Sequence, residues 1–104
     1  MAVLPLSAEQ REGIRSLCVQ FGVRSLRLFG SAARGGFDAA RSDLDFLVEL
    51  GSVAGMNRFQ QFMRFKLALE DLLERPVDLV SASAVHDARF RAAAESSAIE
   101  LYAA

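Results

Sequence analysis

Two aspartates one residue apart, Asp43 and Asp45, stand at the start of an otherwise apolar run. Because side chains alternate along a β-strand, this spacing places both carboxylates on one face and leaves Leu44, Phe46 and Val48 on the other. Two adjacent carboxylates repel each other, and a divalent cation would remove the repulsion. Oxygen ligands suit Mg²⁺ or Mn²⁺. The pattern therefore predicts a strand with one core-facing side and one cation-binding side.

A strand is also predicted over residues 23–29, and it ends at the pair Gly30-Ser31. Glycine allows a ligand to approach the backbone closely, and the N-terminus of a short helix predicted over residues 31–34 would offer N–H groups to a phosphate. Read alone, Gly30-Ser31 is an ordinary turn with Ser31 as an N-cap. The paired acids that follow at short range favour the phosphate-binding alternative.

Two further polar residues lie between the predicted strands. Arg34 could contact the phosphates of a nucleotide, or it could form an ion pair with a nearby acid such as Asp38. Ser42 could simply begin the next strand, or it could hold the loop against that strand through a side-chain hydrogen bond. These alternatives stay open at the level of sequence.

A third aspartate, Asp78, interrupts the short apolar strand predicted over residues 77–80. It could lie on an exposed face or pair with an arginine. Alternatively, the long helix predicted over residues 56–74 carries the chain back to a neighbouring strand. In that arrangement Asp78 comes beside Asp43 and Asp45 and completes an acidic triad.

Helices complete the expected fold. Ser7 is the predicted N-cap of an amphipathic helix over residues 7–21, which Gly22 ends. A further helix is expected near residues 84–95, followed by a packed tail. In the long helix over residues 56–74, the predicted polar stripe consists of Asn57, Gln60, Gln61, Arg64, Asp71 and Glu74. Its predicted apolar side consists of Phe59, Phe62, Met63, Phe65, Leu69, Leu72 and Leu73, and its excess width could face a partner chain.

Composition excludes several classes of function. The 104 residues suit one domain over residues 1–104, and 52% hydrophobic residues are enough for a core. A net charge of −1 argues against non-specific electrostatic binding to nucleic acid. One cysteine and one histidine cannot build a four-ligand zinc site or a disulfide. Without a long apolar run or a secretory signal, we expect a cytoplasmic protein with no membrane contact.

Three segments together resemble one family. The run from Gly30 to Gly35, which reads Gly-Ser-Ala-Ala-Arg-Gly, is followed by Ser42-Asp43-Leu44-Asp45 and then by Val77-Asp78-Leu79-Val80. This pattern resembles the minimal nucleotidyltransferases of the DNA polymerase β-like superfamily, and the likeness extends from about Val19 to Tyr102. It departs from the family's usual pattern at Ala32, where a larger or basic residue is common.

The resemblance implies a nucleotide site and a fold. Gly30 and Ser31 would hold the triphosphate of ATP, with Arg34 and Ser42 nearby. Asp43, Asp45 and Asp78 would bind two Mg²⁺ ions (Mn²⁺ being an alternative) and serve as the catalytic acids. The implied fold is an α/β (α+β) nucleotidyltransferase fold, with a short mixed sheet of three to four strands and helices packed mainly on one face.

The resemblance also suggests a partner. Family members of this size often silence a HEPN-domain toxin by adding AMP from ATP to a tyrosine, so the chain is expected to act as the antitoxin of such a pair. Two alternatives remain. One is a non-catalytic antitoxin that neutralises its partner by binding, and the other is half of a homodimer that adenylylates a small molecule.

Overall fold

A computed structural model describes residues 6–29, 44–82 and 99–104 of the chain. Several sequence-based predictions lie outside these described residues. They concern the short helix over residues 31–34, the helix over residues 84–95, and the site residues Gly30, Ser31, Arg34, Ser42 and Asp43.

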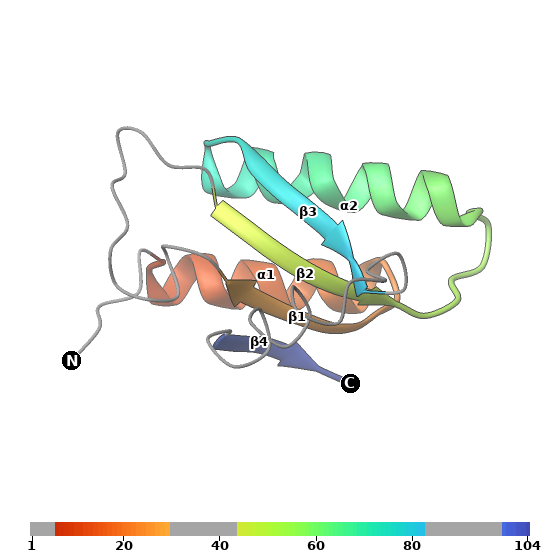
Figure 1. The fold of residues 1–104 in the computed structure, drawn as a ribbon, viewed down its shortest axis with the longest axis horizontal. Helices are drawn as coiled ribbons and strands as arrows, with labels where there is room; N and C mark the ends of the chain where they lie inside the picture. Colours follow the sequence, from red (N-terminus) through yellow and green to blue (C-terminus); the bar gives the residue numbers. More distant parts are fainter. Residues whose placement is uncertain (1–5, 30–43, 83–98) are drawn as a thin grey trace.

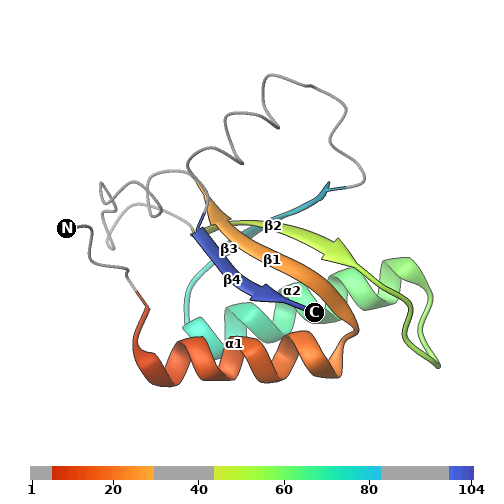
Figure 2. The ribbon, with the colours of Figure 1, turned by 90° about the horizontal axis from the view of Figure 1, so that it is seen from below.

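The described elements form a sheet with helices on one side. They are α1 (Ala8–Gln20), β1 (Val23–Phe29), β2 (Leu44–Leu50), α2 (Arg58–Leu73), β3 (Val77–Ser81) and β4 (Ile99–Ala103). The strand order is β3-β2-β1-β4. β2 and β3 are parallel, whereas β1 is antiparallel to both β2 and β4. Both α1 and α2 cover the same face of this mixed sheet (Figures 1 and 2). The predicted fold class is confirmed.

The N-terminus of α1 follows the predicted capping. The Ser7 side chain accepts a hydrogen bond from the Gln10 backbone N–H at 3.0 Å, and the Gln10 side chain accepts one from the Ser7 N–H at 2.9 Å. These reciprocal bonds satisfy two N–H groups that a helix start leaves without intrahelical partners. The helix ends at Gln20, two residues before Gly22, whose φ of +68° lies in the left-handed region that glycine adopts without strain.

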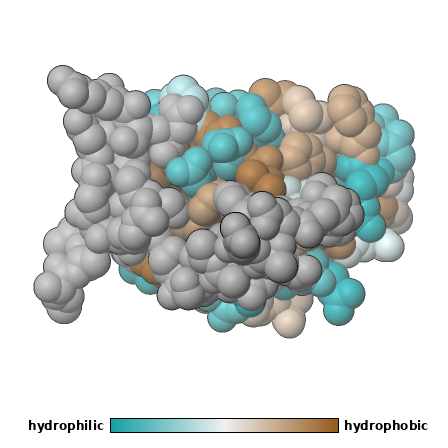
Figure 3. Space-filling view, in the orientation of Figure 1, coloured by the Kyte–Doolittle hydropathy of each residue, from teal (hydrophilic) through white to brown (hydrophobic). Residues whose placement is uncertain are grey.

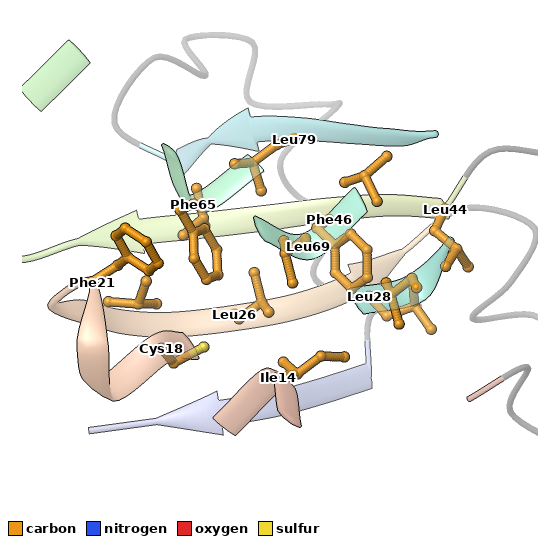
Figure 4. Packing of buried hydrophobic residues seen from close by; sticks show 14 of the residues in the cluster. Ile14, Cys18, Phe21, Leu26, Leu28, Leu44, Phe46, Phe65, Leu69 and Leu79 are labelled. Atoms are coloured by element: carbon orange, nitrogen blue, oxygen red, sulfur yellow. The ribbon is translucent and has the colours of Figure 1, made fainter. Parts of the chain in front are cut away.

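The core lies between the sheet and the two helices (Figure 4). Ile14 and Cys18 come from α1, and Phe65 and Leu69 from α2; all four are fully buried. The strands contribute every second residue to the same cluster, including Leu26, Leu28, Phe46 and Val48. Alternation along the strands therefore commits one face of the sheet to the core, and the other face carries a mixture of polar and apolar residues, among them the buried Leu47.

The start of α2 corrects three predictions. The helix begins at Arg58 after an Asn57 cap, rather than at Met56. Gln61, predicted on the polar stripe, is 2% exposed because its side-chain amide donates to the backbone oxygens of Phe21 at 2.7 Å and Gly51 at 2.9 Å. Phe59, predicted on the apolar side, is 73% exposed. Hydropathy alone misplaces Gln61 because its buried amide is satisfied by backbone carbonyls.

The segment Ile99–Ala103 also differs from the expectation. The sequence predicts a packed tail, whereas the structure shows β4 paired antiparallel to β1, with Tyr102 opposite Leu26 and Glu100 opposite Arg27. The register shifts between Leu26 and Arg27. This irregularity disturbs the strict alternation that would have marked a strand in the sequence.

Hydrophilic and hydrophobic side chains lie intermingled on the described part of the sheet side of the molecule (Figure 3). Within the described ranges, no helix is long and apolar enough to cross a membrane.

Candidate active site

The strand β2 presents a carboxylate on the face of the sheet opposite the helices. Leu44, Phe46 and Val48 are buried in the core, while Asp45, between two of them, is only partly buried. The predicted alternation along this strand is therefore confirmed for the residues that the structure describes. Asp45 points away from the core because a strand turns successive side chains to opposite faces.

The neighbouring strand β3 brings a second carboxylate to the same place. β3 runs parallel to β2, and Asp78 is the register partner of Asp45. Its neighbours Val77 and Leu79 are buried, so the exposed Asp78 projects from the same face as Asp45. Adjacent strands are about 4.8 Å apart, which is within the reach of two carboxylates that share one cation. The predicted juxtaposition of Asp45 and Asp78 is confirmed; their chemical role remains a prediction.

The two acids lie at one end of the sheet. Asp45 is the second residue of β2, and Asp78 is the second residue of β3. On its other side Asp45 is the register partner of Phe29, the last residue of β1. Asp78, Asp45 and Phe29 therefore form one row of paired positions across three strands. Phe29 directly precedes Gly30-Ser31 in the sequence, and Leu44 directly follows Asp43. The end of β1 and the starts of β2 and β3 thus gather the described acids at the point where the predicted phosphate-binding pair begins.

The next row of side chains on this face supplies a cation. Arg27 is the register partner of Leu47 on one side and of Glu100 on β4 on the other. Opposite charges at directly paired positions stabilise an antiparallel strand pair. Arg27 is two residues before Phe29 on the same strand, so a guanidinium lies one row from the acids. The sequence places Arg27 on this face but gives no sign of its pairing with Glu100.

The end of α2 holds a residue that the sequence-based reasoning did not single out. Glu70 accepts a hydrogen bond from the backbone N–H of Val77 at 3.1 Å and one from Lys66 Nζ at 3.4 Å. Val77 immediately precedes Asp78. The spacing of Lys66 and Glu70, four residues apart on a helix, is a signal for their pairing, but it carries no hint of the bond to β3.

The donor set fits a hard divalent cation. Two carboxylates on adjacent strands offer oxygen ligands, which Mg²⁺ takes together with water and phosphate oxygens. In residues 6–29, 44–82 and 99–104, no group of three or more His, Cys, Asp or Glu side chains forms a metal-binding cluster. The third predicted ligand, Asp43, lies outside these ranges.

A family model described as a nucleotidyltransferase domain matches residues 11–101. The chain belongs to this nucleotidyltransferase family. The match includes every described element from α1 to β4 except the first turn of α1 and the end of β4. Members of this family generally use divalent metal ions, which agrees with the paired carboxylates of β2 and β3.

Solved structures agree with the nucleotidyltransferase assignment. A structure described as a candidate minimal nucleotidyltransferase is 40% identical, with a TM-score of 0.73 and 88% of each chain covered. A toxin–antitoxin structure with AMP-PNP is 19% identical, has a TM-score of 0.70, and covers 90% of this chain and 73% of that one. A complex of a tri-AMPylated Shewanella oneidensis HEPN toxin with an MNT antitoxin is 16% identical, has a TM-score of 0.64, and covers 92% of this chain and 71% of that one. At their level of identity, the last two show the fold alone. The comparison with curated proteins finds no significant match.

Proposed function

We propose that this nucleotidyltransferase transfers AMP from ATP to a hydroxyl group of a partner HEPN toxin, with tyrosine as the acceptor, and so acts as an antitoxin. The observation that carries the proposal is the register pairing of Asp45 with Asp78 in a chain of this family. Paired carboxylates at the end of a sheet suit chemistry on a triphosphate, because the negative charge of the substrate must be neutralised there.

The partner and the transferred group are supported by structural likeness. One similar structure is a toxin–antitoxin with AMP-PNP, and another is a tri-AMPylated HEPN toxin with an MNT antitoxin. Both are other proteins. They make an AMP-accepting protein the first partner to test for this chain.

In the proposed reaction, the acceptor hydroxyl oxygen attacks the α-phosphorus of ATP, the bond from that phosphorus to the pyrophosphate oxygen breaks, and pyrophosphate leaves. Asp78 is exposed, whereas Asp45 is partly buried beside Phe29. We therefore assign to Asp78 the side nearer the acceptor, where its carboxylate takes the proton of the hydroxyl. Gly30, Ser31, Arg34 and Ser42 are the proposed contacts of the triphosphate.

Asp43, Asp45 and Asp78 would hold two Mg²⁺ ions. Such ions, when bound, supply positive charge to both the attacking and the departing oxygen of an in-line displacement. The carboxylates would fix the positions of these positive charges. Positioning raises the rate of transfer because the reacting atoms must be aligned.

The test is incubation of the purified chain with Mg²⁺, a HEPN-domain protein as acceptor, and ATP labelled at either the α- or the γ-phosphorus. Transfer of AMP predicts label on the partner from α-labelled ATP and none from γ-labelled ATP. Asp45→Asn and Asp78→Asn should each abolish labelling. Asp71→Asn is the matched control, because Asp71 is an exposed aspartate on α2, remote from the sheet face that carries the acids.

Each other outcome identifies a different function. A partner that is neutralised equally well by Asp78→Asn, without label, indicates an antitoxin that acts by binding. Label on a small-molecule acceptor, formed only by a dimeric species in size-exclusion chromatography, indicates a small-molecule adenylyltransferase. Label from γ-labelled ATP indicates phosphoryl transfer and contradicts the proposal.

A further inference from the structure

The turn that leads into β3 is held at both ends by one residue. The backbone oxygen of Glu70 accepts the N–H of Glu74 at 2.8 Å, which closes the last turn of α2. Its side-chain carboxylate accepts the N–H of Val77 at 3.1 Å, at the first residue of β3. Glu70 therefore joins the end of the helix directly to the start of the strand that carries Asp78.

The connection between these two ends is short and unusual in conformation. Only Glu74, Arg75 and Pro76 separate α2 from β3. Glu74 has a φ of +55°, in the left-handed region that residues other than glycine rarely adopt. A turn with this conformation needs support from its surroundings, and a charged acceptor makes a stronger hydrogen bond to an N–H than a neutral one.

The hydrogen bond to Glu70 acts on Asp78 through the backbone of β3. Val77 is 4% exposed, so its side chain is anchored in the core while its N–H is held by Glu70. Asp78 is the next residue, and it faces Asp45 across the parallel pair. β3 pairs with a single described strand, β2. Among the described contacts at its start are that pairing, the packing of Val77 in the core and the Glu70 bond.

Lys66 completes the arrangement. Its ammonium group lies 3.4 Å from the second carboxylate oxygen of Glu70, four residues away on the same helix, and both side chains are about a quarter exposed (29% and 26%). A surface pair of this kind adds little to stability. It does restrict the rotation of the Glu70 carboxylate, which leaves the other oxygen aimed at Val77.

We propose that Glu70 is a positioning residue for nucleotidyl transfer, which sets Asp78 in register with Asp45 through the N–H of Val77. This inference rests on the proposed function, because it assigns Asp78 a role in the reaction. Glu70 itself touches no reacting atom. It acts by holding the start of β3, and displacements of about 1 Å in such a site can cost roughly 100-fold in rate.

The test compares Glu70→Ala with Glu70→Gln at a temperature where both variants are fully folded. Glu70→Ala removes the acceptor, so we expect the kcat of AMP transfer to fall by about 10- to 100-fold and the Mg²⁺ concentration needed for half-maximal rate to rise, with a smaller change in the KM for ATP. Glu70→Gln keeps one oxygen for the Val77 N–H and should restore most of the rate. Binding of Mn²⁺, followed by its electron paramagnetic resonance signal, should weaken in Glu70→Ala and recover in Glu70→Gln.

Two controls separate positioning from stability. Asp71→Ala removes one negative charge from the adjacent helix position, which makes no bond to β3, and should leave both the rate and Mn²⁺ binding unchanged. Ile14→Val removes a methylene from a fully buried residue of α1 and lowers stability. It should also leave both readouts unchanged in the folded protein.

The failures are distinguishable. If the unmodified chain transfers AMP and Glu70→Ala does so at the same rate with the same Mg²⁺ requirement, the positioning role is wrong and the proposed function stands. If Ile14→Val lowers the rate as much as Glu70→Ala does, the effect is one of stability and the positioning role is again wrong. If the unmodified chain transfers nothing to its partner, the proposed function fails, and this inference fails with it.

Discussion

Among single residues, Cys18 is the clearest case of chemistry suppressed by the fold. It is the one cysteine in the sequence, and its side chain is fully buried between α1 and the sheet. Burial raises the pKa of the Cys18 thiol to about 12, because the thiolate loses its hydration. At neutral pH the reactive thiolate is therefore absent from the folded protein.

We expect a thiol reagent such as iodoacetamide to label Cys18 at the rate of unfolding in native buffer and rapidly in denaturant. Mass spectrometry of samples quenched over time measures both rates. Fast labelling in native buffer would contradict the burial of this residue in the core.

The carboxyl group of Glu70 gives a pH dependence of known sign. The hydrogen bond from the Val77 N–H lowers the Glu70 pKa below its ordinary value of 4.5, and Lys66 acts in the same direction, while partial burial opposes them. Because the pKa is lower in the folded protein, the unfolded chain binds the proton first as the pH falls. The stabilising contribution of Glu70 is therefore complete above pH 4.5 and is lost as the pH falls through the folded pKa.

We expect the difference in free energy of unfolding between the unmodified chain and Glu70→Gln to be largest near neutral pH. It should shrink as the pH is lowered below 4.5 and through the lower pKa of the folded state. Urea unfolding followed by circular dichroism measures it at each pH. A difference that grows toward acid pH would mean that the bond to Val77 does not lower the Glu70 pKa.

Among the elements, α2 shows how one helix divides into core and surface. Leu69 is fully buried, whereas Leu67, two residues earlier, is 57% exposed. Truncation of Leu69 leaves a cavity in a close-packed core, while truncation of Leu67 removes a side chain that is mostly in water.

We expect Leu69→Ala to lower the free energy of unfolding by about 2–5 kcal/mol and Leu67→Ala to change it by less than about 0.5 kcal/mol. The two variants lose the same atoms from the same helix, so helix propensity changes equally in both. Chemical denaturation measures the two values; equal losses would contradict the orientation of α2.

The elements also show what the sequence can and cannot predict. The strands β1, β2 and β3 follow from alternation, and α1 follows from its period and its Ser7 cap. Hydropathy misplaces Gln61 because its side-chain amide donates hydrogen bonds to the backbone oxygens of Phe21 and Gly51, which are distant in the sequence. It also misplaces Phe59, which is 73% exposed although its side chain is apolar. The strand β4 was missed because pairing with β1 defines it, and pairing is a tertiary property.

For the molecule as a whole, the two acids proposed to bind the cation also repel each other, and this repulsion lowers the stability of the fold. The approach of Asp78 to Asp45 could be predicted because a helical connection returns the chain to a parallel neighbouring strand. The hydrogen bond that the Val77 N–H donates to Glu70 could not be predicted, because a turn of three residues sets its geometry. Two like charges one strand spacing apart repel by about 1 kcal/mol in water and by about 3.5 kcal/mol at the effective dielectric constant of a protein surface. A cation bound between the two carboxylates would offset this repulsion.

We therefore expect Asp78→Asn to raise the free energy of unfolding by about 1 kcal/mol in metal-free buffer, because it removes one of the two charges. Added Mg²⁺ should raise the melting temperature of the unmodified chain, since a ligand that binds only the folded state stabilises it by mass action. It should have a much smaller effect on Asp78→Asn. Thermal denaturation with and without Mg²⁺ measures all four values, with Asp71→Asn as the control that should behave like the unmodified chain. An equal response to Mg²⁺ in Asp78→Asn would mean that the bound cation does not depend on the Asp78 carboxylate, which contradicts its proposed role as a ligand.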